Sequence, residues 1–181
     1  MARPLTGGEM AMVRWLFGAA IDTGRVRVHD RRYLPFGLQP KHCAMAPNGH
    51  LYFHHSCWRA DFAGASPHDQ HWFMHEMVHV WQHQLGYPVR LRGALRIGLD
   101  YAYRLAPDAT LADFNMEAQG DLLADYFVLK FVGKPGAMRQ GNYAGSLALF
   151  ERVLAQFLAH PQERANLPSG IARRLAMRPL W

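Results

Sequence analysis

The sequence is poor in cysteine and lacks a long hydrophobic run. Its 181 residues include only two cysteines, Cys43 and Cys57. These are too few for a disulfide scaffold and lack the paired spacing of a four-cysteine zinc site, so they either form one bridge or stay free. Glu9 and Arg14 interrupt the apolar stretch near the N-terminus. We therefore expect no signal peptide and no integral membrane segment, which makes the chain cytoplasmic at synthesis.

Internal repeats and low-complexity segments are also missing, and acidic residues are outnumbered by basic ones. The formal net charge is +6, but the basic residues are spread along the chain, with local density only within residues 90–96 and 173–178. A solvated basic surface explains this charge better than a dedicated anion site, and we expect no nucleic-acid partner. Half of the residues are hydrophobic, which at this length indicates one domain spanning residues 1–181.

Capping motifs predict where the first two helices begin. Thr6 and Glu9 form a capping box before apolar residues at helical spacing, and Gly24 is a plausible end for that helix. Ser66 is an N-cap followed by proline, and Asp69 completes the cap. This second helix is expected to run to residue 86.

The second half of the chain is expected to be helical after an irregular connection over residues 87–114. Asn115 is a good N-cap for a third helix, which the Gly-Lys-Pro-Gly sequence of residues 133–136 would end. Asn142 could cap a fourth helix that Pro161 would stop. The arginine-rich C-terminal tail could also be helical.

A β-hairpin is predicted before the second helix. Residues 43–46 and 50–54 are short apolar or aromatic runs, and Pro-Asn-Gly at residues 47–49 is a strong tight-turn signal between them. The expected fold class is therefore α+β and mainly α: a zincin-like single domain with a small β-hairpin or sheet preceding the helix of residues 66–86.

That helix carries the motif His75-Glu76-Met77-Val78-His79. Residues four apart lie on one face of a helix, so both imidazoles can bind one ion, and neutral imidazoles suit zinc. Glu76 lies beside them, where it can take a proton from a water molecule that the metal activates. The motif predicts a Zn²⁺ site with Glu76 as the catalytic base.

Chance is a weak explanation for this motif. A random chain of this composition would contain it with a probability on the order of 2%, and apolar residues at helical spacing surround it here. The competing interpretation is a helix with solvated or core-capping histidines. His71 and His83 extend the same row and could make another pair, but neither is followed by a glutamate in the required position.

A catalytic zinc usually has three protein ligands, so another must come from elsewhere in the chain. We predict Glu117, at the start of the third helix, with Asp121 on the same face to orient His75 or His79 through its second ring nitrogen. The compact third histidine of other zincins is absent, because the sixth residue after His79 is a leucine. The alternative ligands are Glu151, His54, His55 and His160.

Residues around the metal are harder to assign. Tyr101, Tyr103, His83 and Tyr126 are candidate hydrogen-bond donors to the developing oxyanion, and the sequence does not rank them. An exposed strand edge beside a zinc site can align an extended peptide, in which case residues 50–53 would line the cleft.

These motifs resemble gluzincins, in which a His-Glu-x-x-His helix is joined by a Glu-x-x-x-Asp helix. The chain is more closely similar to the metallopeptidase domain of proteins associated with bacterial type VI secretion, including Vgr-related proteins and the toxic C-terminal extension of some VgrG spike proteins. The resemblance lies in residues 45–53, 75–82, 115–121 and 124–127, which fall between residues 45 and 127, a little under half of the chain.

The resemblance implies zinc on His75, His79 and Glu117, with Glu76 as the base. It also implies an antibacterial effector that a type VI system delivers into the envelope of the target cell, which needs no signal peptide. A protein or peptide substrate, a secretion spike and an immunity protein are the partners that it implies.

The chain departs from the family pattern at Val78, where the family has threonine, and at Ala118, where glutamine is more frequent. Neither position is a ligand. Two other functions stay open: an amidase or peptidase that acts on cell-wall peptides with the same zinc site, and a non-catalytic zinc-stabilised binding module. A fourth protein ligand such as His71 or His83 would favour the binding module, because it would close the metal site.

Overall fold

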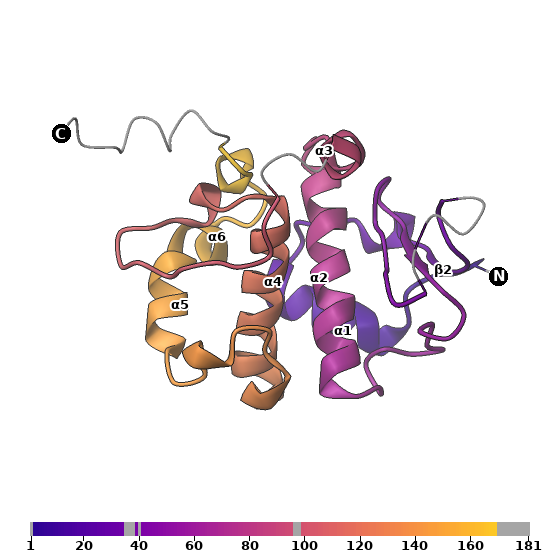
Figure 1. Cartoon of the computed structure of the whole chain (residues 1–181), viewed down its shortest axis with the longest axis horizontal. Helices are drawn as coiled ribbons and strands as arrows, with labels where there is room; N and C mark the ends of the chain where they lie inside the picture. The colour runs from indigo at the N-terminus through magenta and orange to yellow at the C-terminus, as the bar shows by residue number, and fades with distance from the viewer. Residues whose placement is uncertain (1, 35–38, 40, 96–98, 170–181) are drawn as a thin grey trace.

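Two helices, α2 (Pro67–Gln84) and α4 (Met116–Phe127), pack side by side at the centre of the protein (Figure 1). The computed structural model describes residues 2–34, 39, 41–95 and 99–169. The N-terminal part of the chain, with helix α1 and a small sheet, lies on one side of this pair, and α5 and α6 lie on the other. The remaining α-helices are α1 (Gly7–Phe17), α3 (Val89–Leu95), α5 (Leu147–Val153) and α6 (Ala155–Ala159).

The sheet has three short strands in the order β1-β2-β3, which are β1 (Ala2–Arg3), β2 (Val28–Asp30) and β3 (Leu51–Phe53). β1 pairs with β2 antiparallel, and β2 pairs with β3 parallel. On its other side, β3 is joined by an antiparallel bridge between Met45 and Tyr52. This bridge closes the predicted hairpin around the Pro-Asn-Gly turn. The fold is a mainly helical α+β domain with a small sheet before the central helices, as the sequence predicts.

Local hydrogen bonds fix the starts of α1, α2 and α4 where the sequence places them. The Thr6 hydroxyl accepts from the Glu9 N–H, and the Glu9 carboxylate accepts from the Thr6 N–H, which completes the capping box of α1. The Ser66 hydroxyl accepts from the backbone N–H of Asp69 at the start of α2. The Asn115 side chain accepts from two N–H groups in the first turn of α4.

Aromatic packing holds the C-terminal half of α2 in place. Trp81 is fully buried and contacts the rings of Phe17 from α1 and Phe157 from α6. Its indole N–H donates to the backbone oxygen of Pro161 at 2.7 Å. Burial of these rings contributes the apolar area that fixes α2 between the two sides of the protein.

Several helix boundaries differ from the sequence predictions. α1 ends at Phe17, well before Gly24, because Gly18 adopts a positive φ of 56° and stops the helix there. The connection predicted to be irregular contains α3. α4 continues as a π-helix (Val128–Val132) and ends at Gly133, within the predicted stop signal.

The last predicted helix begins at Leu147 rather than after Asn142, and it is divided into α5 and α6 at Leu154. Short 3-10 helices complete the secondary structure: Thr23–Arg25, Leu111–Asp113, Pro135–Ala137, Gly141–Tyr143 and Arg164–Asn166. The tail predicted to be helical lies outside the described residues after position 169. No disulfide involves Cys43 or Cys57 within the part of the chain that the structure describes. Among the described residues, no helix is long and apolar enough to span a membrane.

Candidate metal centre

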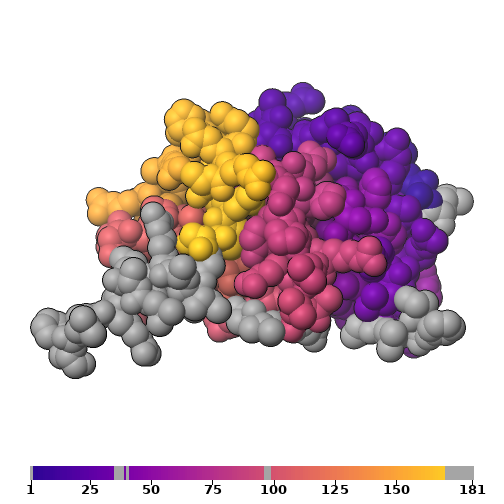
Figure 2. Space-filling view, turned by 90° about the horizontal axis from the view of Figure 1, so that it is seen from above, coloured from indigo at the N-terminus to yellow at the C-terminus, as the bar shows by residue number. Residues whose placement is uncertain are grey.

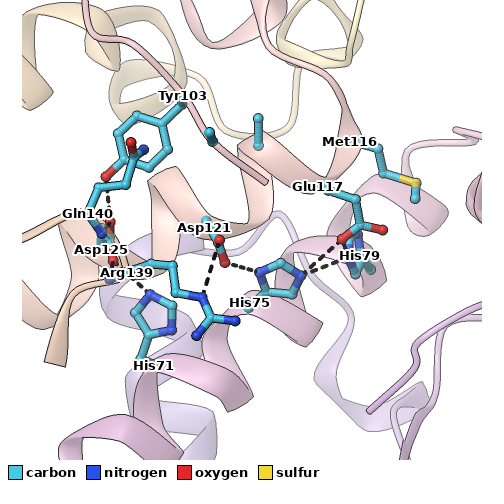
Figure 3. A network of polar contacts seen from close by, with 12 residues as sticks. His71, His75, His79, Tyr103, Met116, Glu117, Asp121, Asp125, Arg139 and Gln140 are labelled. Carbon is cyan, nitrogen blue, oxygen red and sulfur yellow. Dashed lines mark hydrogen bonds and ion pairs between the residues drawn. The ribbon is translucent and has the colours of Figure 1, made fainter. Parts of the chain in front are cut away.

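Three histidines of α2 face three carboxylates of α4 across the central helix pair (Figure 3). Each histidine pairs with a carboxylate, and each step of four residues forward along α2 matches four residues backward along α4, as an antiparallel arrangement requires. The pairs are His71 with Asp125, His75 with Asp121, and His79 with Glu117. We call this row the His–acid ladder.

At one end of the ladder, three ligand atoms converge on one point. The Nε2 atoms of His75 and His79 are 3.2 Å apart, and Glu117 Oε2 lies 3.3 Å from the first and 3.2 Å from the second. Among the described residues, this is the group of histidine, cysteine and acidic side chains whose ligand atoms could hold a metal ion. The structure therefore brings together the three residues that the sequence proposes as ligands.

Hydrogen bonds on the far side of each imidazole set its orientation. His75 Nδ1 lies 2.8 Å from Asp121 Oδ1, and His79 Nδ1 lies 2.9 Å from Gln82 Oε1. Because both acceptors require an N–H at Nδ1, the Nε2 lone pairs face the convergence point. This is the orientation that a metal-binding imidazole needs. The sequence predicted Asp121 for one of the two histidines, and the structure pairs it with His75.

Gln82 was missed at the sequence level. Its amide nitrogen donates to Gln119 Oε1 at 2.9 Å and to the Met116 carbonyl, so it links His79 to α4. Gln119 in turn donates to the backbone oxygens of Leu111 and Asn166. The sequence signal that could have identified Gln82 is its position three residues after His79, which places its side chain within reach of that imidazole.

Gly120 makes the close approach of the two helices possible. A Cβ atom at this position would lie 2.6 Å from His75 Cε1 and 2.8 Å from His75 Nδ1. Real Cβ atoms do not come this close, so the His75 ring occupies space that any other residue would fill. The absence of a side chain at Gly120 therefore lets His75 reach both Glu117 and Asp121.

Charges in the cluster stabilise one another. Burial alone would lower the pKa of His75, but hydrogen bonds to Asp121 and Glu117 outweigh it and raise the pKa to about 10. Burial likewise opposes the raised pKa of His79, which Glu117 causes. Burial would raise the pKa of Glu117, but the two histidines hold it well below its usual value. Glu117 and Asp121 thus favour positive charge at the two imidazoles, as the acidic residues of a cation site do.

Glu76 is 4% exposed, and its Oε2 atom is buried without a hydrogen-bond partner among the described residues. Burial raises the pKa of this carboxyl group, against the opposing effect of His75 and His79. A buried carboxyl group with a shifted pKa beside a group of possible metal ligands is a candidate functional residue.

The cluster opens into a cavity of about 750 Å³. Glu76 and Glu117 line it together with the two converging histidines, whereas His71, Asp121 and Asp125 do not. The rest of its lining comes mainly from residues 43–47, from α3 and from residues around Tyr101. Only one end of the His–acid ladder therefore lines the cavity.

The other end of the ladder is closed. Asp125 accepts hydrogen bonds from His71, from the Tyr103 hydroxyl and from the backbone N–H groups of Arg139 and Gln140. Burial would raise the pKa of Asp125, but these hydrogen bonds, that of His71 first, hold it below its usual value. A fully bonded carboxylate with no access to the cavity is a structural link between the helices.

The alternative ligands lie away from the cluster. Glu151 pairs with Lys130 on the surface at 2.7 Å, and His54 Nδ1 lies 2.8 Å from the Ser56 hydroxyl. His55 and His160 are not members of the metal-capable group among the described residues, and nor are His71 and His83.

The surroundings of the four candidate oxyanion donors differ, and they distinguish one candidate from the other three. Tyr103 is bonded to Asp125, and Tyr126 is buried against aromatic rings. The His83 ring lies against Gly49. Tyr101 is 50% exposed, lines the cavity and stacks on His75 with ring centroids 6.0 Å apart. It is the candidate that the structure places beside the cluster.

The prediction that residues 50–53 line the cleft is wrong. β3 has β2 on one side and the Met45 bridge on the other, so it lies inside the sheet and its residues are buried. The other arm of the hairpin, residues 43–47, lines the cavity instead. The sequence identified the hairpin, but the long-range pairing with β2 decides which arm faces the cavity.

Comparisons with known proteins find similarity to a spike protein and to the solved structure of its effector domain. The type VI secretion system spike protein VgrG2b of Pseudomonas aeruginosa is 45% identical over 135 residues, which cover 71% of this chain and 13% of that protein. The solved effector domain of Pseudomonas aeruginosa VgrG2b is 42% identical, with a TM-score of 0.65, and the match covers 79% of this chain and 82% of that domain. No family model matches the chain. The chain thus spans a small part of the spike protein and most of the effector domain.

Proposed function

The chain belongs to the family of the VgrG2b effector domain, and from that membership and the geometry of its metal centre we propose that it is a zinc-dependent peptidase. The proposal assigns His75, His79 and Glu117 as zinc ligands and Glu76 as the catalytic base. The gluzincin-type resemblance of the two helix motifs points to the same assignment.

The observation that carries the proposal is the spacing of the three ligand atoms. Ligands at the usual zinc bond lengths of about 2.0–2.1 Å lie about 3.3–3.4 Å apart in a tetrahedral site. The three separations here are 3.2, 3.2 and 3.3 Å. Two imidazole nitrogens and one carboxylate oxygen are also a donor set that suits zinc and leaves one tetrahedral position open. The residues therefore fit the ion.

The chemistry divides between the ion and the side chains of the chain. A zinc ion held here would polarise the carbonyl of the scissile peptide bond and lower the pKa of a water molecule. Glu76, which lines the cavity, accepts the proton of the attacking water and then donates it to the leaving amine. Asp121 and Gln82 keep the ligand imidazoles in one orientation throughout.

An open site favours an enzyme over a zinc-stabilised binding module. A structural zinc usually has four protein ligands, and the candidates for the fourth are His71 and His83. His71 is bonded to Asp125, and the His83 ring lies against Gly49. The ligand cluster instead faces a cavity with Glu76 in its wall.

We further propose that the chain acts as a type VI secretion effector on a protein or peptide substrate in the envelope of a target cell. Its similarity to a type VI secretion spike protein with an effector domain supports this. A secretion spike and a cognate immunity protein would then be its partners. Digests of envelope proteins and of purified peptidoglycan distinguish a general protease from an enzyme that acts on cell-wall peptides.

The test compares zinc content and casein or peptide cleavage in the wild-type chain, Glu76→Gln and Glu151→Gln. Glu76→Gln should retain zinc and lose about 10²–10⁴-fold in kcat, because it removes the proton carrier without removing a ligand. Glu151→Gln makes the same chemical change in the surface pair with Lys130 and should leave both measurements unchanged. Wild-type turnover in the Glu76 variant would overturn the mechanism. In a separate variant, Glu117→Ala should lower zinc occupancy, and full retention would show that another residue is the third ligand.

A further inference from the structure

Helix α3 presents two different faces. Val89, Arg90, Gly93 and Ala94 line the cavity, and they form two pairs of residues four apart, which lie on one side of a helix. The remaining residues of α3 face away, and Leu91 and Leu95 are 58% and 54% exposed. Arg90 and Arg92 therefore lie on the same short helix but on opposite sides of it.

The cavity side of α3 leaves room for a bound chain. Val89 is 4% exposed and anchors the helix at the position before Arg90. One turn later, a Cβ atom added to Gly93 would meet only Met116 Cε, at an ordinary contact distance of 3.9 Å. Because Gly93 and Ala94 are small, this side of the cavity leaves space beside Arg90 in which a peptide backbone can lie.

Arg90 is the lone lysine or arginine among the described residues that line the cavity. Its side chain is exposed, and it forms no hydrogen bond or ion pair within the described part of the chain. The cavity also contains the carboxylates of Glu76 and Glu117. Glu117 is paired with the two histidines, whereas the unpaired guanidinium of Arg90, with its planar fork of donors, fits a carboxylate through two parallel hydrogen bonds.

We propose that Arg90 binds a carboxylate of the substrate, which makes the preferred substrate an anionic peptide with an acidic side chain or a free C-terminal carboxylate close to the scissile bond. The inference rests on the proposed function in one respect, namely that the ligand is a peptide. Seen from above in Figure 2, the pink segment that includes α3 lies at the surface between the N-terminal part of the chain in indigo and purple and the C-terminal part in yellow. A peptide can therefore approach α3 from solvent.

The test measures binding rather than turnover, in the zinc-loaded chain carrying Glu76→Gln so that the probes stay intact. The probes are alanine hexapeptides with a neutral fluorophore and an amidated C-terminus, in which one glutamate occupies each position in turn. Matched glutamine peptides and an all-alanine peptide with a free C-terminus complete the set. Fluorescence polarisation gives the ratio of affinities for each acidic peptide and its neutral twin. The same ratios are measured after adding Arg90→Gln, Arg90→Lys or Arg92→Gln.

In the Glu76→Gln chain, the best acidic peptide should bind about tenfold to hundredfold more tightly than its neutral twin, as expected for hydrogen bonds to a charged group. Arg90→Gln should bring this ratio close to one, Arg90→Lys should keep part of it, and Arg92→Gln should keep all of it. The position of the best glutamate, or a preference for the free C-terminus, distinguishes the two sources of the carboxylate.

Two results would overturn the inference: no acidic preference in the Glu76→Gln chain, or a preference that survives Arg90→Gln, since the metal rather than Arg90 would then bind the carboxylate. The proposed function fails separately. If the ratio depends on Arg90 but the chain with Glu76 intact cleaves no peptide, the carboxylate site stands and the peptidase does not. If peptides are cleaved and neither source of carboxylate is preferred, the peptidase stands without the specificity.

Discussion

Replacing Gly120 with alanine tests whether the two central helices are packed as closely as the metal centre requires. In an ordinary helix this change stabilises the protein, because alanine exceeds glycine in helix propensity by about 1 kcal/mol. Gly120 lies within α4, but a Cβ atom there would lie 2.6 Å from His75 Cε1. Carbon atoms pack at about 3.5–4.0 Å, so the overlap is about 1 Å.

The His75 ring cannot relieve this overlap cheaply. Moving it away from α4 lengthens the 2.8 Å contact between Nδ1 and Asp121 and withdraws Nε2 from Glu117. Overpacking a well-packed interior costs about 1–3 kcal/mol, of which the gain in propensity offsets about 1 kcal/mol. We expect the metal-free variant to be about 0–2 kcal/mol less stable than the wild type. Zinc affinity should fall by about 10–100-fold, the effect typical of disturbing the residues that orient a ligand.

The assay has two parts. Denaturant unfolding in the presence of a chelator gives the stability of the metal-free chain, and competition with a chromophoric chelator gives zinc affinity. Gly7→Ala is the control, since its added Cβ would meet nothing within 4 Å at the start of α1. It should leave zinc affinity unchanged. Wild-type zinc affinity in Gly120→Ala, together with a gain in stability, would refute the close packing of His75 on α4.

Two further variants test the groups that hold the ladder. Gln82→Leu removes the acceptor of His79 Nδ1 and the donor to Gln119. It should lower the free energy of unfolding by about 2–3 kcal/mol, measured by urea unfolding, and zinc affinity by about 10–100-fold, measured by chelator competition. An unchanged zinc affinity would contradict the role of Gln82 in orienting His79. Asp125→Asn should lower the free energy of unfolding by about 2–4 kcal/mol at pH 7, because it weakens the hydrogen bonds that a buried carboxylate accepts. The pKa of Asp125 is lowered in the folded state, so its contribution to stability is complete above the unfolded pKa of about 3.9 and is lost as the pH falls through the folded pKa. The difference in unfolding free energy between wild type and Asp125→Asn, measured by urea unfolding, should therefore narrow below about pH 4. A constant difference from pH 7 to pH 3 would contradict this.

Features that depend on near neighbours in the chain could be predicted from the sequence. The capping residues Thr6, Ser66 and Asn115 act on N–H groups within three positions, so their patterns identify helix starts without any knowledge of the fold. The metal-binding motif of α2 is also local, because its two histidines share a face in any helix. The Pro-Asn-Gly turn has the same character, and the hairpin it predicts is present.

Features that depend on packing between distant segments could not be predicted from the sequence. α3 has seven residues, contains a glycine and lacks a capping signal, so tertiary contacts through Val89 hold it rather than its own propensity. The lining of the cavity by residues 43–47 follows from the pairing of β3 with β2, more than twenty positions earlier in the chain. The role of Gly120 follows from the distance between two helices, which no local pattern encodes.

The His–acid ladder shows how one repeated interaction can serve three purposes. The three rungs have the same chemistry and the same spacing along α2 and α4, and what surrounds each rung decides its role. The first rung is closed, because Tyr103 and backbone N–H groups occupy the remaining capacity of Asp125. At the second rung, Asp121 holds Nδ1 of His75 while Nε2 faces the next rung, so one imidazole belongs both to the structural row and to the ligand cluster. The third rung opens to the cavity. A row of buried pairs thus positions the ligand atoms, and a change at the closed rung should reach the metal centre only through the relative position of α2 and α4.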